Sequence, residues 1–449
     1  MKIWARTFVF VLLAGYVGVA QQAAPKAPAP AARATAARQL PSAPPESVGI
    51  SSARLEKLHS GMQGYVDRHE AAGIVTLIAR DGKIADIHAS GFQDLESSKA
   101  MQVDTIFRIA SMTKPITSVA AMMLEEEGKI FLTDPVSKYI PAFKGQRVVG
   151  EGGALVPARR EITIRDLMSH RSGLSYGFLN GGAVGDAYRK EGVTDGLSMT
   201  SMTLQEGIDK LAAQPLMAQP GSAWNYSLST DALGRVIEVA SGMPLDKFFH
   251  DRIIVPLGMT DTSFDVPEAK WSRFSTVYAP NGPGALRPMK DPESFGNAQF
   301  SPFTSYKVPK KYFSGGAGLT STIQDYARFA QMLVNGGVLD GVRLLSPKTI
   351  ELMTGSQTSD LPAAALLGPG TQFALGFRVV TDVAATQTQG SVGMYGWLGI
   401  YGTTFWVDPK ENMFVVFAMQ SPKNRVAYRP VLRSMIYAAI EKPARAATD

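Results

Sequence analysis

Strand-like segments lie at both ends of this sequence, whereas its middle has the apolar spacing of helices. Residues 74–78 and 84–88 are short apolar runs on either side of Asp81-Gly82, the pattern of a two-stranded hairpin. Residues 403–407 and 414–419 flank a second turn that is rich in breaker residues. The pattern therefore predicts one sheet that the two ends of the chain build together.

The middle of the chain predicts a mainly helical region inserted between the two parts of that sheet. The segments with helical spacing are 111–127, 163–169, 204–213 and 230–240, and an apolar run at 373–380 and a helical pattern at 432–440 follow. Two long loops rich in Gly, Pro and Ser, 177–201 and 280–309, interrupt the middle, and loops of this length are usually functional. The predicted fold class is α/β plus all-α, with a sheet from about 46–108 and 310–449, flanked by helices, and a helical region at about 109–309.

Composition excludes several classes of protein and site. The chain has no cysteine, which excludes disulfides, a thiol nucleophile and thiolate metal ligation, and its five histidines leave little for a metal site. The net charge is +6, but residues 1–45 hold five cations and no acid, so the rest of the chain is close to neutral. We therefore expect no nucleic-acid partner, no metal and no organic cofactor.

The N-terminus has the layout of a secretory signal peptide. Two cations in residues 1–7 precede an apolar run at 8–19 that is too short to span a bilayer, and small residues follow at 18–20. Residues 21–45 are rich in Ala and Pro and predict a disordered linker. We expect residues 1–20 to be removed on export to a bacterial periplasm or the medium, leaving no membrane span; an uncleaved signal anchor is the alternative.

One candidate nucleophile is Ser175, in the only G-x-S-x-G pattern of the chain, at 173–177. That hydrolase motif requires a strand before the serine, a helix after it and a histidine base late in the chain. Here a helical stretch comes first and a Gly-rich loop follows, and the last histidine, His250, lies in a helix-like run. We therefore interpret Ser175 as a loop residue near the site.

The stronger candidate is Ser111, in the only S-x-x-K pattern, Ser111-Met112-Thr113-Lys114. Pro115 is tolerated only in the first turn of a helix, so Ser111 is predicted at a helix start. Residues three apart share a helix face, so the Lys114 amine can reach the serine hydroxyl, and the helix N-terminus favours negative charge there. The alternative is a helix-capping serine with a solvated lysine one turn later.

The segment around Ser111 resembles the active-site segment of the serine β-lactamase-like superfamily, and its nearest branch is the family VIII carboxylesterases, relatives of class C β-lactamases. The matching segments, in the family's order, are 107–115 (FRIASMTKP), 132–136 (LTDPV), 167–174 (LMSHRSGL), 220–227 (PGSAWNYS) and 257–259 (LGM). The similarity runs from about residue 46 to 440 and implies a β-lactamase/DD-peptidase-like fold with an antiparallel sheet.

The resemblance implies a role for each matching residue. Ser111 matches the nucleophile, Lys114 its neighbouring base, and Tyr226 the tyrosine that shuttles a proton between nucleophile and leaving group. Without the resemblance, Tyr226 reads as a core aromatic beside Trp224. Asp231 also matches a family position, and we interpret it as a supporting carboxylate rather than a catalyst.

The third motif departs from that of the β-lactamases. No K-T-G sequence is present, and Lys348-Thr349 lie in a helix-like run. The expected strand carries residues 396–400 (GWLGI), which resemble the esterases' W-x-G. The resemblance implies an apolar wall at Trp397 in place of a cationic docking point, close approach of substrate at Gly399, and an oxyanion donor at Ile400 together with Ser111.

These residues together predict a serine hydrolase that cleaves short-chain or aryl carboxylic esters through an acyl-enzyme. The alternatives are a β-lactamase, a D-amino-acid peptidase or an acyltransferase of the same superfamily, and a non-catalytic penicillin-binding-like sensor. The expected partner is a small-molecule ester or amide. The physiological substrate and the oligomeric state are left open.

Overall fold

The computed structural model describes residues 1, 39–179, 182–362 and 364–443. The chain divides into two units, 1–34 and 35–449, and the second unit carries the fold. The predicted signal peptide and most of the predicted linker fall in residues 2–38, outside the described residues.

An eight-stranded antiparallel sheet is built from both ends of the chain, as predicted. Its strand order is β14-β15-β16-β17-β18-β1-β2-β3. The strands are β1 (Gly73–Arg80), β2 (Lys83–Asp94), β3 (Lys99–Ala100), β14 (Thr371–Phe373), β15 (Arg378–Val380), β16 (Tyr395–Leu398), β17 (Thr404–Asp408) and β18 (Met413–Ala418). The two ends meet where β1 pairs with β18, with Leu77 opposite Val416.

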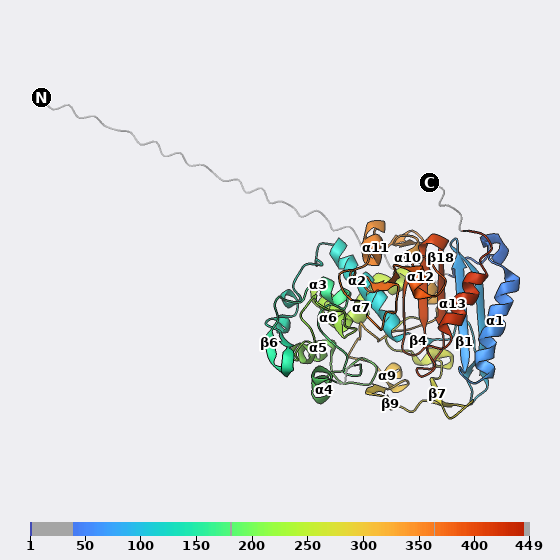
Figure 1. Cartoon of the computed structure of the whole chain (residues 1–449), viewed down its shortest axis with the longest axis horizontal. Coiled ribbons are helices and arrows are strands. Elements are labelled where there is room, and N and C mark those ends of the chain that lie inside the picture. Colours follow the sequence, from blue (N-terminus) through green and yellow to red (C-terminus); the bar gives the residue numbers. More distant parts are fainter. Residues whose placement is uncertain (2–38, 180–181, 363, 444–449) are drawn as a thin grey trace. The chain divides into compact units, whose positions relative to one another are not determined.

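Both faces of the sheet are buried, because successive side chains of each strand enter two different cores. On β1, Val75 and Leu77 belong to one core, whereas Ile74 and Ile78 belong to the other. Helix α10 (Ile323–Val334) covers the first face, and α1 (Ser52–Asp67) and α13 (Arg429–Ala438) cover the second. Figure 1 shows α1 and α13 side by side at one edge of the fold.

The helical region lies beyond the first face, on the side of Figure 1 opposite α1. Its helices are α2 (Thr113–Glu126), α3 (Ile164–Met168), α4 (Ala183–Lys190), α5 (Leu204–Ala212), α6 (Ser229–Ser241), α7 (Leu245–Phe249), α8 (Val255–Leu257) and α9 (Thr304–Lys307), and α11 (Pro347–Thr354) and α12 (Val383–Thr386) follow later in the chain. Helix α6 is its centre and contacts α2, α3, α5 and α7. The predicted cap at Thr163 is present, and its side chain accepts a hydrogen bond from the Asp166 N–H.

The structure differs from the prediction in three places. Helix α4 lies in the predicted loop 177–201, and two hairpins, β7 (Tyr278–Pro280) with β8 (Leu286–Pro288) and β9 (Glu293–Phe295) with β10 (Ala298–Phe300), occupy much of 280–309. The apolar run 373–380 is two strands rather than one, because the chain turns at Gly376, whose φ is +95° and whose Cβ position is filled by Ser118.

The predicted linker also ends too late. Leu40 is buried in the core, and the Ala43 N–H donates to the Ile84 carbonyl while the Ile84 N–H donates to Pro41. Residues 40–43 therefore belong to the fold and pair with β2 at Ile84. None of the helices in the described residues has the length and apolar character needed to cross a bilayer.

Candidate active site

Ser111 lies where the chain turns from a short strand into α2. Strand β4 (Phe107–Arg108) leads into a 3-10 turn, Ala110–Met112, and α2 begins at Thr113 with Pro115 in its first turn. Ala110 has φ +42°, a conformation that costs a non-glycine residue about 1–3 kcal/mol. The helix start predicted from Pro115 is therefore present, and Ser111 lies in the strained turn directly before α2.

The Lys114 amine is held by three oxygen atoms. Lys114 Nζ donates to Ser111 Oγ at 3.3 Å, to the Tyr176 hydroxyl at 3.0 Å and to the Gly316 carbonyl at 2.8 Å. An ammonium group has three protons, so each has an acceptor. Lys114 is buried, with only 1% of its surface exposed. In its neutral form this amine is placed to accept the Ser111 proton.

Tyr176 is the residue that the sequence reasoning missed. It stands next to the candidate Ser175 and two residues after the matching segment 167–174, and that proximity was the available signal. Burial raises the pKa of the Tyr176 phenol well above its ordinary value, and the nearby Tyr226 and Asp231 raise it further. The phenol therefore stays protonated and can pass a proton between Lys114 and a bound group.

Tyr226 lies beside this trio but faces another partner. Its ring centre is 4.6 Å from Lys114 Nζ and 5.3 Å from the Tyr176 ring centre. Its hydroxyl accepts a hydrogen bond from Trp397 Nε1 at 3.4 Å, and none from Ser111 or Lys114 is found in the described residues. Its role as the proton shuttle stays a prediction, with Tyr176 as a second candidate for the same role.

Asp231 supports the site without touching Ser111. It lies in the first turn of α6 and is fully buried, and it accepts hydrogen bonds from Ser314 Oγ at 2.6 Å and the Tyr312 hydroxyl at 3.4 Å. Burial raises the pKa of the Asp231 carboxyl, against the opposing charge of Lys114. Asp231 thereby holds the Ser314–Gly316 segment whose carbonyl accepts from Lys114, which agrees with its interpretation as a supporting carboxylate.

His170 packs behind Tyr226 as a neutral side chain. It is buried, its ring centre is 4.9 Å from that of Tyr226, and its Nδ1 lies 3.2 Å from Ser227 Oγ. Burial lowers the pKa of His170 well below its ordinary value, and the charge of Lys114 lowers it further. His170 therefore positions Tyr226 by packing and takes no direct part as a base.

The third motif occupies the strand that borders Ser111. Trp397 is buried on β16, and its ring lies 5.5 Å from that of Tyr226 and 5.1 Å from that of Phe373. Ile400 and Trp397 line the same cavity as Ser111. No backbone hydrogen bond from the Ile400 N–H is found among the described residues, which leaves its predicted role as an oxyanion donor open to test.

The expectation for Gly399 is corrected. A Cβ there would lie 2.2 Å from Thr403 Oγ1 and 2.4 Å from the Ile109 carbonyl, and the Gly399 N–H donates to the Thr403 carbonyl. The close approach that requires glycine is therefore made by the chain's own backbone, next to the turn that carries Ser111. Gly399 positions the nucleophile turn against β16 rather than admitting substrate.

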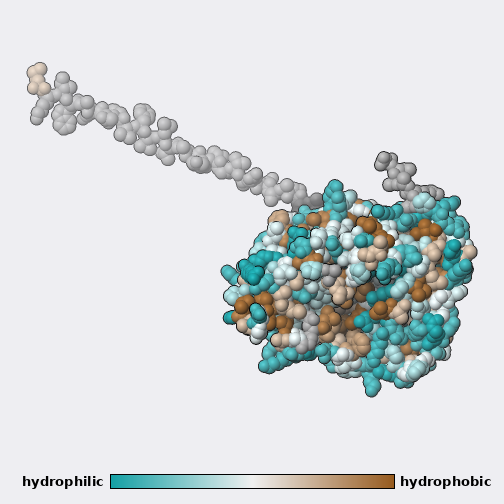
Figure 2. Space-filling model, viewed as in Figure 1, coloured by the Kyte–Doolittle hydropathy of each residue, from teal (hydrophilic) through white to brown (hydrophobic). Residues whose placement is uncertain are grey.

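Ser111 opens into a cavity of about 200 Å³. Its walls include Tyr176, Tyr226 and Trp397 near the serine and mostly apolar side chains beyond, such as Leu197 and Leu398. In Figure 2 hydrophobic residues gather near the middle of the face shown, and hydrophilic residues dominate its outline. A cavity of this size admits a small substrate or one end of a longer one.

Cationic side chains line this cavity, although the strand motif supplies none of them. Arg378, Arg425 and Arg429 line it together with Ser111. Lys348-Thr349 do lie on helix α11, as predicted, so the strand motif itself carries no cation. The cations come instead from β15, from the segment after β18 and from the start of α13. These three segments share no sequence motif that would have indicated a common site.

Ser175 lacks the surroundings that a nucleophile needs. It is fully buried, and its Oγ donates to the Tyr176 carbonyl at 3.3 Å. Helix α3 precedes it in place of a strand, and His250 is exposed and bonded to Asp251. The G-x-S-x-G pattern therefore lies in the loop that places Tyr176 beside Lys114, and it does not form the strand–turn–helix motif of a hydrolase nucleophile.

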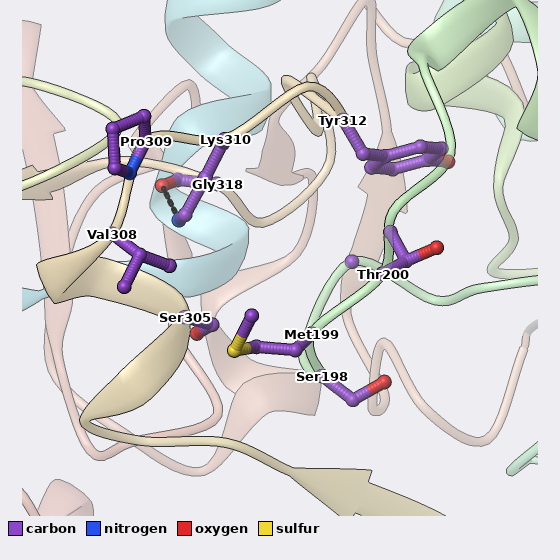
Figure 3. Close-up of a pocket in the computed structure, with 10 residues that line it drawn as sticks. Ser198, Met199, Thr200, Ser305, Val308, Pro309, Lys310, Tyr312 and Gly318 are labelled. Atoms are coloured by element: carbon purple, nitrogen blue, oxygen red, sulfur yellow. Dashed lines mark hydrogen bonds between the residues drawn. The ribbon is translucent and has the colours of Figure 1, made fainter.

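A second, smaller cavity, shown in Figure 3, does not have Ser111 in its wall. It measures about 30 Å³, the space of one water, and Lys310, Tyr312 and Gly318 line it. Lys310 Nζ donates to the Gly318 carbonyl at 3.3 Å, and burial lowers the pKa of this lysine to about 7. No serine, cysteine or threonine hydrogen-bonds to Lys310 Nζ in the described residues, so it has no nucleophile to activate.

No group of three or more metal-ligating side chains is found within the described ranges. The chemistry available is that of a serine hydroxyl, an amine and two phenols around a mostly apolar cavity. This set supports covalent acyl transfer through Ser111.

Comparison with known proteins agrees with this geometry. The family model described as Beta-lactamase matches residues 59–435. Esterase EstB of Burkholderia gladioli is 34% identical over 352 residues, which cover 77% of this chain and 84% of that protein. A putative D-alanyl-D-alanine carboxypeptidase of Salmonella typhimurium is 29% identical over 407 residues, covering 86% and 87% of the two chains.

A solved structure is also similar. EstCE1, described as a hydrolase with promiscuous acyltransferase activity, superimposes with a TM-score of 0.76 at 31% identity, over 86% of this chain and 99% of that one. The family model spans most of the chain, and the structural match spans nearly all of its relative. The chain therefore belongs to the beta-lactamase family and is a serine hydrolase.

Proposed function

We propose that this protein is a carboxylesterase that hydrolyses short-chain or aryl esters through an acyl-enzyme on Ser111. Ser111 Oγ attacks the ester carbonyl while its proton passes to neutral Lys114. The negative charge on the carbonyl oxygen faces two backbone N–H groups, that of Ser111 just before α2 and that of Ile400 just after β16. Collapse of this intermediate breaks the ester C–O bond, and the alcohol leaves with the proton through Tyr176 or Tyr226.

Water completes the cycle. It attacks the acyl carbonyl and gives one proton to Lys114, and the carboxylic acid leaves as Ser111 Oγ takes that proton back. Lys114 must be neutral at the start of each half-reaction. Its contact with Ser111 then reverses direction, so that the single lone pair of the amine accepts a proton there, while its two remaining N–H bonds donate to the Tyr176 hydroxyl and the Gly316 carbonyl.

The observation that carries the ester assignment is the identity of the strand bordering Ser111. Trp397 and Leu398 of β16 stand where β-lactamases carry K-T-G, and the only Lys-Thr pair of that part of the chain lies on α11. A carboxylate next to the scissile bond, as in a β-lactam, then lacks the lysine and threonine of K-T-G as its docking point. An ester without that carboxylate loses nothing and packs against Trp397.

Two of the similar proteins support the same proposal. EstB is named an esterase, and EstCE1 is described as a hydrolase that also transfers acyl groups. Acyl transfer to an alcohol follows from the same intermediate if an alcohol replaces water. The name of the Salmonella relative makes D-alanyl peptides the second substrate class to assay.

The test compares kcat/KM for p-nitrophenyl butyrate and nitrocefin on one preparation. We expect the ester value to exceed the nitrocefin value by about 10-fold or more, the effect of losing one charge-assisted hydrogen bond. A nitrocefin value equal to or above the ester value overturns the proposal in favour of a β-lactamase. A protein that binds a labelled penicillin but turns over neither substrate is a sensor.

A further inference from the structure

Three arginines line the Ser111 cavity, and we call them the arginine end: Arg378, Arg425 and Arg429. Arg378 comes from β15, Arg425 from the segment after β18, and Arg429 is the first residue of α13. All three line the cavity that also contains Ser111. Side chains from three separate segments therefore converge on one space.

These arginines have no anionic partner among the described residues. None of them forms an ion pair, and one N–H of Arg425 donates a hydrogen bond to the Pro422 carbonyl. Arg429 Nε and Nη2 are buried atoms without a hydrogen-bond partner in the described part of the chain. A buried guanidinium proton that lacks an acceptor is destabilising, so the arrangement favours a ligand that accepts from it.

A fourth arginine increases the crowding of positive charge. Arg433 lines the neighbouring cavity with Arg378 and Arg429, donates to Thr388 Oγ1 at 3.1 Å, and lies over the Trp406 ring. Burial and the charges of Arg433 and Arg429 lower the pKa of Arg378 to about 10. Guanidinium groups held together in this way repel one another, and an anion between them removes that repulsion.

The single acidic side chain of the cavity wall does not serve as their partner. Asp195 lines the cavity, but its charge acts on Tyr176 and Tyr312 near the serine, and it forms no ion pair with the arginines. Its side chain accepts a hydrogen bond from the Leu197 N–H at 3.0 Å. The arginine end therefore remains a region of uncompensated positive charge within the substrate cavity.

The strand register separates the arginine end from the nucleophile. Arg378 pairs with Gly396 on β16, so its side chain lies on the opposite face of the sheet from that of Trp397, the next residue. The cavity reaches from Ser111 past Leu398 to Arg378. An anion bound by Arg378 would therefore lie on the other face of β16 from Trp397, away from the wall that borders Ser111.

We propose that Arg378, Arg425 and Arg429 bind a carboxylate carried by the substrate at the end remote from its ester bond. Planar guanidinium forks match the two oxygens of a carboxylate and bind it bidentately. This inference rests on the proposed function and narrows it: the preferred substrates are carboxylate-bearing esters, such as half-esters of dicarboxylic acids, rather than simple neutral esters.

The experiment compares charged and neutral esters of equal chain length. Mono-p-nitrophenyl adipate and suberate are assayed against p-nitrophenyl hexanoate and octanoate, with 6-(butyryloxy)hexanoate against hexyl butyrate to place the carboxylate in the alcohol. We expect at least one charged ester to exceed its neutral partner by about 10- to 100-fold in kcat/KM, and added salt to shrink that ratio.

Variants locate the effect. Arg378→Gln and Arg429→Gln are expected to lower kcat/KM for the favoured charged ester by about 10- to 100-fold and to change the neutral ester by less than about 3-fold. Arg429→Lys is expected to restore part of the loss. Arg54→Gln, an exposed arginine of α1, removes the same charge elsewhere and is expected to leave both substrates unchanged.

The outcomes separate this inference from the proposed function. Hydrolysis of hexanoate that depends on Ser111 supports the esterase assignment whatever the charged esters do. Equal rates for charged and neutral esters, or equal losses on both substrates in Arg378→Gln and Arg429→Gln, overturn the carboxylate site. Retained hexanoate turnover in each variant shows that it is folded.

Discussion

The two ends of one cavity differ in how completely their polar groups are satisfied. At the reacting end, which comprises Ser111, Lys114, Tyr176 and Tyr226, the lysine has an oxygen acceptor for each of its three protons. At the arginine end, buried nitrogen atoms of Arg429 have none in the described residues. The first arrangement is complete before substrate arrives, whereas the second is completed by a ligand.

The comparison shows how one fold divides catalysis from selection. The reacting end is built from α2 and the helical region, which pack against β16. The arginine end is built from β15, the segment after β18 and the start of α13. Substitutions at the reacting end should therefore lower turnover of every substrate, and substitutions at the arginine end should change only the ranking of substrates.

The largest effect is expected at Lys114. Lys114→Met removes the amine that accepts the Ser111 proton but keeps a buried side chain of similar length. We expect kcat for p-nitrophenyl butyrate to fall by about 10²- to 10⁴-fold, the usual contribution of general acid–base catalysis. A loss below 10-fold, measured on protein with an unchanged melting temperature, would show that another group takes the proton.

The two tyrosines divide the next effect between them. Tyr176→Phe removes the hydroxyl that lies 3.0 Å from Lys114 Nζ, whereas Tyr226→Phe removes one that contacts only Trp397 Nε1 among the described residues. We expect Tyr176→Phe to lower kcat by about 10- to 1000-fold and more than Tyr226→Phe does. The reverse order assigns the shuttle to Tyr226, as the family resemblance implies.

The pH dependence separates the two ends further. A guanidinium with a pKa of about 10 stays charged as pH rises to about 9 and loses its charge only above that, and a substrate carboxylate with a pKa near ~4.3 is ionised above about pH 6. Burial raises the pKa of Asp195 in the same cavity wall to about 6, so its charge changes around that pH. The ratio of charged to neutral ester kcat/KM is therefore expected to stay constant from about pH 7 to about 9, while both absolute values change with the protons of the reacting end. A ratio that changes 10-fold across this range contradicts an arginine–carboxylate contact.

The smallest effect on turnover is expected at Ser175. Ser175→Ala removes a buried hydroxyl that donates to the Tyr176 carbonyl, so the expected cost is about 1 kcal/mol of unfolding free energy and less than about 3-fold in kcat. Chemical denaturation and the butyrate assay measure the two quantities. Loss of turnover in a stable Ser175→Ala protein would restore the G-x-S-x-G interpretation.

Most of the fold follows from local pattern. The apolar runs of β1, β17 and β18 and the breaker-rich turns between them are legible in the sequence, and Pro115 fixes the start of α2. The pair of Ser111 and Lys114 also follows, because residues three apart on a helix share a face. Each of these inferences needs only the residues of one short segment.

The parts that were missed depend on contacts between distant segments. Tyr176 reaches Lys114 from 62 residues away, through a loop whose own motif suggested different chemistry. The arginine end needs the register of β15 against β16 and the position of α13, neither of which any one segment specifies. The glycine at 399 was recognised as a close approach, but only the structure identifies the approaching group as the Ile109 carbonyl.

The central claim is that Ser111 carries the acyl group, and direct detection of that adduct tests it most plainly. Protein quenched in acid during turnover of p-nitrophenyl butyrate is measured by intact mass and then by peptide mapping. We expect a single butyryl group on the peptide that contains Ser111, absent in Ser111→Ala and present in Ser175→Ala. An adduct on Ser175, or full turnover by Ser111→Ala, would contradict the account.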